Sequence, residues 1–299
     1  MQHRRSRATG AALLTTAAAI AGAGHAAGVS PAPITVAVSV PSLESLVAPA
    51  LPPSAQIEAL PRTPGDVHGA ELSPSTVLTA LTADVLVYTS DRAEPAMARL
   101  ADRRRALGAP SVAFVDDHGE PSHAHDHAAL GAGAEHPWLD PALVASRWPV
   151  FASELARAAG VTDPAAGPSS AVRDAREVEG AYRVAAADLA GWSLVSVHGA
   201  ADAALRDAGF TVLAPMSRGH GVGVTPSAIA RLATAADRTG GRVILLIDAS
   251  LPAGLAGRLE RRFGVRLAFI NTASGRDWER LMRENLRSVL AAALAPGSR

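Results

Sequence analysis

The stretch Ile34-Thr-Val-Ala-Val-Ser-Val40 decides the fold class, because a β-branched run of this length predicts a buried strand. Residues 42–50 follow it directly and predict the start of a helix. The alternation continues with helices at residues 74–82 and 94–107 and strands at residues 85–88 and 111–115. Strands that alternate with helices indicate a parallel sheet covered on both faces.

The second half of the chain restarts this alternation. Strands are predicted at residues 193–197, 211–214, 243–247 and 266–270, and helices at residues 200–208, 226–239, 251–263 and 277–294. Helices are also predicted at residues 141–159 and 171–189, and the second of these is interpreted as the connection between the two series. We therefore expect an α/β fold of two lobes, each with a mostly parallel sheet flanked by helices.

The N-terminus predicts export. His3-Arg-Arg-Ser-Arg7 is basic, and residues 11–23 form an uncharged, mostly small and apolar run. This run is shorter than the roughly 20 residues that span a bilayer, and no later stretch qualifies. The alternative is a disordered Ala-rich tail. Because the chain has no Cys, no disulfide and no lipid-modified Cys is possible, and we expect a soluble protein, free in the periplasm.

The predicted organisation is a signal peptide, an N-terminal α/β lobe, an interlobe helix and a C-terminal α/β lobe. The expected boundaries are residues 1–28, 29–168, 169–190 and 191–299. The 28 Lys and Arg residues balance the 28 Asp and Glu residues, so no net field favours nucleic acid or an anionic membrane as a partner. Function must be sought in local sites.

Eight of the ten histidines lie beyond the predicted signal, and three of them have a defined local setting. His68 precedes a helix that Ser73 would cap, with Pro74 at its first position. His198 follows the predicted strand 193–197, and ligands of open α/β sheets bind beyond the carboxyl ends of the strands. Alternatively, His68 is an ordinary surface residue and His198 a structural cap or core residue.

His136 has the most specific setting. It lies in Glu135-His-Pro-Trp-Leu-Asp-Pro141, where Trp138 and Leu139 are expected to anchor a turn in the core. Asp140 is expected to cap the helix that follows. A turn held in this way gives the imidazole of His136 a fixed direction.

These segments, in this order, resemble the zinc and manganese substrate-binding proteins of bacterial ABC importers, the cluster A-I family that includes the zinc-uptake and treponemal metal-binding proteins. Residues 68–74 match the family's His-x-x-x-x-Ser/Thr-Pro, and residues 136–141 match its His-x-Trp-Leu-Asp-Pro. Residues 195–200 match a Val-x-x-His-x-Ala-like run, and residues 278–286 look like the family's closing helix. The resemblance covers most of the chain after the signal.

The resemblance implies two α/β lobes joined by a long rigid helix, with a metal ion held between them by His68, His136 and His198. It implies capture of a divalent metal ion in the periplasm and delivery to the membrane permease of an ABC importer. We expect a monomer that is not an enzyme. Three neutral imidazoles suit Zn²⁺, whereas Mn²⁺ prefers more carboxylate oxygen, so zinc is the expected cargo and manganese the second choice.

The fourth ligand stays open at this point. Family members with a carboxylate there usually place an Asp after the last strand, where this chain has Asn271. Asp248 matches a position that is often acidic in the family, and it would bind the ion directly or orient His198. Asp248 as a plain helix cap is the alternative. Glu71 and water are the remaining candidates.

A His-rich loop lies between the first two site histidines. It is polar, contains Gly and Pro, and carries His118, His123, His125 and His127. Zinc-binding members of the family often have such a loop, which implies weak auxiliary sites that gather zinc. The alternative is a solvated insert with no role. His220, between two glycines, is assigned none.

The sequence leaves two other function classes open. Three histidines and an open position also make a hydrolytic zinc site, which lowers the pKa of bound water to about 7. No helical His-Glu-x-x-His, Gly-x-Ser-x-Gly or phosphate-binding loop supports an enzyme. The other class is a relative with a degenerate site that serves adhesion or signalling.

Overall fold

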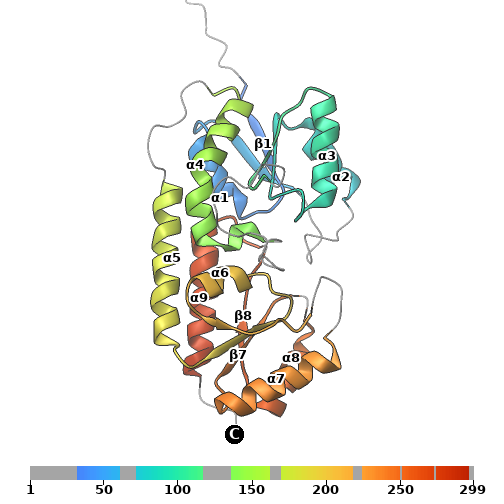
Figure 1. Ribbon diagram of the computed structural model, residues 1–299. Coiled ribbons are helices and arrows are strands. Elements are labelled where there is room, and N and C mark those ends of the chain that lie inside the picture. The colour runs from blue at the N-terminus through green and yellow to red at the C-terminus, as the bar shows by residue number, and fades with distance from the viewer. Residues whose placement is uncertain are drawn as a thin grey trace, which may run out of the picture. The chain divides into compact units, whose positions relative to one another are not determined.

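The computed structural model describes residues 32–60, 72–116, 136–161, 170–217, 224–249, 251–272 and 274–295 (Figure 1). By its internal contacts the chain divides into Met1–Ala32 and Pro33–Arg299, and every helix and strand named below belongs to the second unit. The predicted signal, residues 1–28, lies outside the described residues. Within the described part of the chain, no helix has the length and apolar character needed to span a bilayer.

Among the described residues, eight strands form two parallel sheets of four, and the alternation predicts seven of these strands. The N-terminal sheet has the order β2-β1-β3-β4, from β1 (Thr35–Val38), β2 (Gln56–Ala59), β3 (Val85–Tyr88) and β4 (Ser111–Ala113). The C-terminal sheet has the order β6-β5-β7-β8, from β5 (Ser193–Ser196), β6 (Thr211–Val212), β7 (Val243–Ile247) and β8 (Arg266–Phe269). The two orders are equivalent, so the fold is doubled and the predicted fold class is confirmed.

The helices follow the predicted alternation. In the N-terminal half they are α1 (Leu43–Val47), the 3₁₀ turn η1 (Ala48–Ala50), α2 (Pro74–Thr82), α3 (Pro95–Ala106), the 3₁₀ turn η4 (Pro137–Leu139) and α4 (Pro141–Ala158). Helix α5 (Ser170–Asp188) leads to the C-terminal half. That half contains α6 (Asp202–Asp207), α7 (Pro226–Thr239), α8 (Ala253–Phe263) and α9 (Trp278–Leu294).

One strand and several boundaries differ from the predictions. Strand β2 was not predicted, because in its sequence Gln-Ile-Glu-Ala the polar residues alternate along an exposed edge. Strand β4 ends at Ala113 rather than at residue 115. Helix α6 begins at Asp202 rather than at residue 200, because Gly199 adopts a left-handed φ of 84° and its carbonyl accepts from the Asp202 N–H at 3.1 Å in a separate turn.

The central strands are buried and apolar. Strand β3 reads Val-Leu-Val-Tyr and is buried throughout, and β7 reads Val-Ile-Leu-Leu-Ile and is buried up to its last residue. Such runs are typical of parallel strands covered on both faces. In register, Val38 of β1 lies opposite Val87 of β3, and Ser196 of β5 lies opposite Leu246 of β7. The chain therefore leaves both strands of each central pair at the same end of its sheet.

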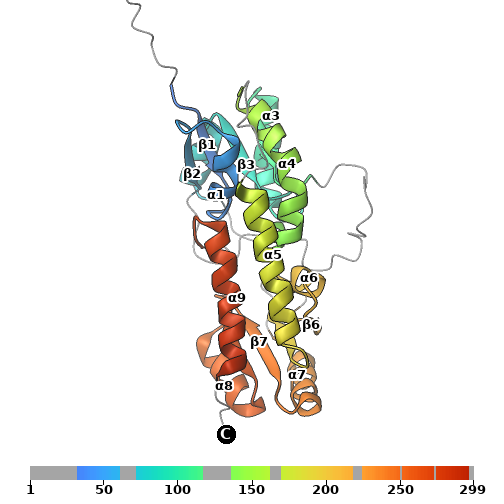
Figure 2. The ribbon, with the colours of Figure 1, turned by 90° about the vertical axis from the view of Figure 1, so that its left-hand side faces the viewer.

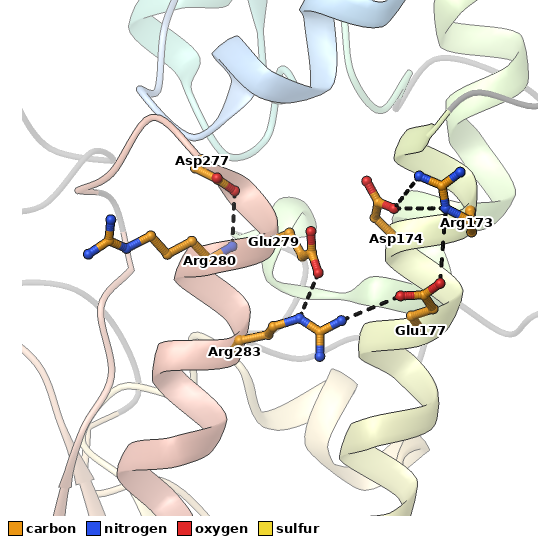
Figure 3. Close-up of polar contacts among 7 residues, drawn as sticks. All are labelled: Arg173, Asp174, Glu177, Asp277, Glu279, Arg280 and Arg283. Atoms are coloured by element: carbon orange, nitrogen blue, oxygen red, sulfur yellow. Dashed lines mark hydrogen bonds and ion pairs between the residues drawn. The ribbon is translucent and has the colours of Figure 1, made fainter.

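Helices α4, α5 and α9 connect the two halves. Figure 2 shows α5 and α9 as neighbouring long helices, and the hydroxyl of Tyr182 in α5 donates to the carbonyl of Met282 in α9 at 3.0 Å. Arg283 of α9 also contacts Glu279 at 2.6 Å and Glu177 of α5 at 3.6 Å (Figure 3). One apolar cluster includes side chains of both sheets and of all three helices, so the halves share a continuous core.

Candidate metal centre

The turn that carries His136 is built as the sequence predicts. His136 immediately precedes η4, whose Trp138 and Leu139 are 0% and 1% exposed. Asp140 caps α4 by accepting from the N–H groups of Ala142 and Leu143 at 3.0 and 3.1 Å. Burial raises the pKa of Asp140, and these two hydrogen bonds act against that shift. His136 is itself 3% exposed, so its ring is fixed by the packed turn that follows it.

His198 lies two residues beyond the end of β5. Because β5 pairs with β7, the residue that follows β7, Asp248, lies beside it. Nδ1 of His198 is 2.6 Å from Oδ2 of Asp248, and both side chains are more than nine-tenths buried. This short contact places Nδ1, and not Nε2, of the His198 ring against the carboxylate.

The structure brings His136 and His198 together from different halves. Their ring centroids are 5.5 Å apart, at an interplanar angle of 48°. A zinc-bound imidazole nitrogen lies about 2.0–2.1 Å from the ion, which puts the ring centroid about 3.2 Å from it and two centroids about 5.2 Å apart at a tetrahedral angle. The observed separation fits two rings that share one ion.

A small pocket adjoins His198. Its lining comes from the segments that follow β5, β7 and β8, namely residues 196–201 and 246–248 with Ile270 and Thr272. These are the carboxyl ends of three parallel strands, where open α/β sheets bind their ligands. The pocket therefore lies where a ligand would be expected.

Asn271 lies next to this pocket, and its side chain closes a turn. Its Oδ1 accepts from the N–H and the hydroxyl of Ser274 at 2.9 and 2.8 Å, and its Nδ2 donates to the Ser274 carbonyl at 2.6 Å. The buried side chain of Asn285 in α9 bonds both the N–H and the carbonyl of Asn271, at 2.8 and 2.9 Å. These bonds hold the segment after β8 against α9.

The other predicted ligands lie outside the described residues. They are His68, Glu71 and the loop residues His118, His123, His125 and His127; His220 lies outside as well. Across the described ranges alone, no three His, Cys, Asp or Glu side chains are close enough together to hold a metal ion. Of the predicted metal ligands, His136 and Asp248 each lie close to His198, while Asn271 lies beside the pocket.

Sequence reasoning missed a buried acid beside His198. Asp202, the first residue of α6, is 3% exposed, and its Oδ2 is 3.4 Å from a guanidinium nitrogen of Arg206. Burial raises the pKa of Asp202, while the Ser196 hydroxyl, Arg206 and His198 act in the opposite direction. An Asp at the start of a helix looks like an ordinary cap, so the sequence carried no signal of its burial.

It also missed the contacts that Trp138 and Trp278 make between the halves. Nε1 of Trp138 donates to the carbonyl of Thr272 at 2.9 Å, and Nε1 of Trp278 donates to the carbonyl of Trp138 at 2.6 Å. Both indoles are at most 1% exposed. Their apolar character was readable from the sequence, but their partners, more than 130 residues away, were not.

Solved structures of ZnuA and FpvC share the fold of this chain. A ZnuA structure superposes with a TM-score of 0.67 at 14% identity, over 87% of this chain and 99% of that chain. A ZnuA deletion mutant with bound zinc gives 0.70 at 15%, over 88% and 99%. The binding protein FpvC of Pseudomonas aeruginosa, in complex with Mn²⁺, gives 0.61 at 18%, over 87% and 98%.

The family is shown by the sequence itself. The chain belongs to the ZnuA family, described as zinc-uptake complex component A, periplasmic, whose model matches residues 36–292. The family resemblance predicted from the sequence is therefore confirmed. No curated protein sequence matches the chain. Members of this family are metal-binding transport components that work with a membrane permease, not enzymes.

Proposed function

We propose that this chain captures zinc, in preference to manganese, in the periplasm and delivers it to the membrane permease of an ABC importer. The observation that carries the proposal is the pair of buried imidazoles, His136 and His198, at a spacing that fits one shared ion. Neutral imidazoles favour zinc over manganese, which prefers oxygen ligands. The zinc-bound ZnuA structure supports this choice, and the Mn²⁺-bound FpvC makes manganese the competing cargo.

In this proposal His68, His136 and His198 bind the ion. The carboxylate of Asp248 at Nδ1 of His198 leaves Nε2 of that ring to face the metal and raises its basicity. Asp248 also supplies a negative charge close to a dication whose imidazole ligands are neutral. The carboxamide of Asn271 already bonds Ser274, which favours a structural role over ligation. The fourth position then falls to Glu71, Asp248 or water.

The histidines of the loop, His118, His123, His125 and His127, are proposed to form weak auxiliary sites that raise the local zinc concentration. Deletion of residues 119–127 is expected to leave the tight site intact and to remove only weaker binding. Loss of the high-affinity phase in a zinc titration of this deletion variant would show that the tight site includes the loop.

Zinc titration of the purified protein against a chelator of known affinity tests the site. The wild type should bind one zinc ion tightly, and His136→Ala or His198→Ala should weaken binding by orders of magnitude. His220→Ala is the matched control, because no role is assigned to that histidine. An unchanged affinity in either site variant would remove that residue from the site, and turnover of a model ester would support a hydrolase instead.

Delivery needs a separate test. In the source organism, deletion of the gene should reduce growth in zinc-depleted medium, and the wild-type gene should restore it. His136→Ala should fail to restore growth although the protein reaches the periplasm at the wild-type level. Full restoration by this variant would contradict a transport role that depends on the site.

A further inference from the structure

We propose that Trp278 is a positioning residue that holds His136 at its distance from His198 before any metal arrives. The inference rests on the proposed function, because it requires His136 and His198 to share one ion. Trp278 itself lies outside the proposed ligand set. Trp278 is the first residue of α9, in the C-terminal half, whereas His136 lies on the turn before α4 in the N-terminal half. The structure links them through Trp138.

The link consists of two hydrogen bonds that cross between the halves in opposite directions. The indole N–H of Trp278 donates to the carbonyl of Trp138 at 2.6 Å, and the indole N–H of Trp138 donates to the carbonyl of Thr272 at 2.9 Å. Both indoles are essentially fully buried, so neither donor has water as a competing partner. The backbone of Trp138 is therefore fixed relative to the segment that follows β8.

The ring of His136 follows this fixed backbone. His136 is two residues before Trp138, and the two ring centroids are 5.1 Å apart. The turn between them is a single 3₁₀ turn closed by a 2.9 Å hydrogen bond from the N–H of Leu139 to the carbonyl of His136. A movement of Trp138 is thus passed on to His136 without a flexible segment between them.

Trp278 itself has a firm base. Its backbone N–H donates to the hydroxyl of Ser45 in α1 at 2.8 Å, which ties the start of α9 to the N-terminal half a second time. Farther along α9, Met282 accepts from Tyr182, and Arg283 contacts Glu177 (Figure 3). Since α9 is thereby fixed against α5, the indole of Trp278 is a fixed point from which the His136 turn is held.

None of these bonds involves the side chain of a proposed metal ligand, so they form without the ion. A preorganised pair of ligands avoids the ordering that binding would otherwise demand, and affinity rises by the free energy of that ordering. Removal of the Trp278 donor should therefore weaken metal binding although Trp278 does not touch the ion. One net hydrogen bond corresponds to a roughly 3- to 10-fold change in the dissociation constant.

Trp278→Phe removes the donor and keeps an aromatic ring in the core. Trp148→Phe is the matched control, because Trp148 is also buried and donates at 2.9 Å to a carbonyl, that of Leu46, but within the N-terminal half. Both variants lose one indole hydrogen bond and similar packing. Only Trp278→Phe should raise the zinc dissociation constant, by roughly 3- to 10-fold, at equal occupancy of the folded state.

A second measurement follows the two halves without metal. Because the chain has no Cys, spin labels introduced through Leu107→Cys in the N-terminal half and Arg258→Cys in α8 report one distance without background labelling. Both positions are exposed. In the metal-free protein the distance distribution should broaden in the Trp278→Phe background and stay unchanged in the Trp148→Phe background.

The outcomes separate this inference from the proposed function. A wild-type protein that binds no zinc would contradict the proposed function. The distance measurement would still test the link between Trp278 and Trp138. If Trp278→Phe matches Trp148→Phe in either zinc affinity or distance distribution, the positioning role is overturned. If Trp278→Phe does not fold, Trp138→Phe, which loses the bond to Thr272, takes its place with the same two expectations.

Discussion

Replacement of Asp248 by Asn tests whether its carboxylate orients His198 or binds the ion itself. The amide has nearly the shape of the carboxylate but carries no charge. In the structure Oδ2 of Asp248 lies 2.6 Å from Nδ1 of His198, and both groups are buried, so solvent does not screen the contact. We expect Asp248→Asn to fold and to bind zinc more weakly.

The size of the loss distinguishes the two roles. Partners that orient a metal-binding histidine typically contribute 10- to 100-fold to metal affinity, which corresponds to about 1.4–2.7 kcal/mol. Because the 2.6 Å contact engages Nδ1, we expect the effect of Asp248→Asn to fall in this range. A direct ligand would contribute more, and its loss should approach that of His198→Ala.

Competition with a chromophoric chelator at pH 7 gives the dissociation constants. Asp237→Asn is the control, because Asp237 is exposed on α7, and it makes the same change in net charge. A loss below about twofold would refute any contribution of Asp248 to the site, and equality with His198→Ala would replace the orienting role by ligation. The control should bind zinc like the wild type.

Three further predictions concern stability of the metal-free protein. Arg104→Met should lower the free energy of unfolding by about 3 kcal/mol or more in a denaturant titration, because this buried guanidinium donates to several carbonyls that would lose their partner. Asp277→Ala should lower it by about 1 kcal/mol, because Oδ1 of Asp277 caps α9 by accepting from Arg280 at 3.0 Å. Burial raises the pKa of Asp202 above its ordinary 3.8, so its ionisation destabilises the fold as pH rises beyond that value. Asp202→Asn should therefore raise the melting temperature at pH 7 and not at pH 3. An equal shift at both pH values would contradict this assignment.

The fold could be predicted from sequence because its signals are local. Residues 243–247 and 226–239 coincide with β7 and α7, since a buried apolar run and a helix with a capping Thr and a C-terminal Gly are each specified within a few residues. Strand β2 could not be predicted in this way. Its sequence has two polar residues in four, and it is a strand because β1 offers it an edge to pair with.

The site was predictable to the extent that motifs are local. The turn around His136 carries its own anchors and cap, and the sequence identifies both. The contact of His198 with Asp248 depends on the pairing of β5 with β7, which places residues 50 positions apart in sequence beside each other. The link from Trp278 to Trp138 depends on the packing of α9 against the N-terminal half, and no local pattern encodes it.

The shared core constrains how the metal ion can leave. Trp138 and Trp278 are buried where the halves meet, and an indole buries about 150–250 Å², or roughly 4–6 kcal/mol at 25 cal/mol per Å². An opening that exposed both would cost about 8–12 kcal/mol, which is comparable to the whole stability of a domain. Thermal fluctuation therefore does not separate the halves widely. If the chain delivers its ion to a permease as proposed, we therefore expect release to need a small displacement of the ligands and not a wide separation of the halves.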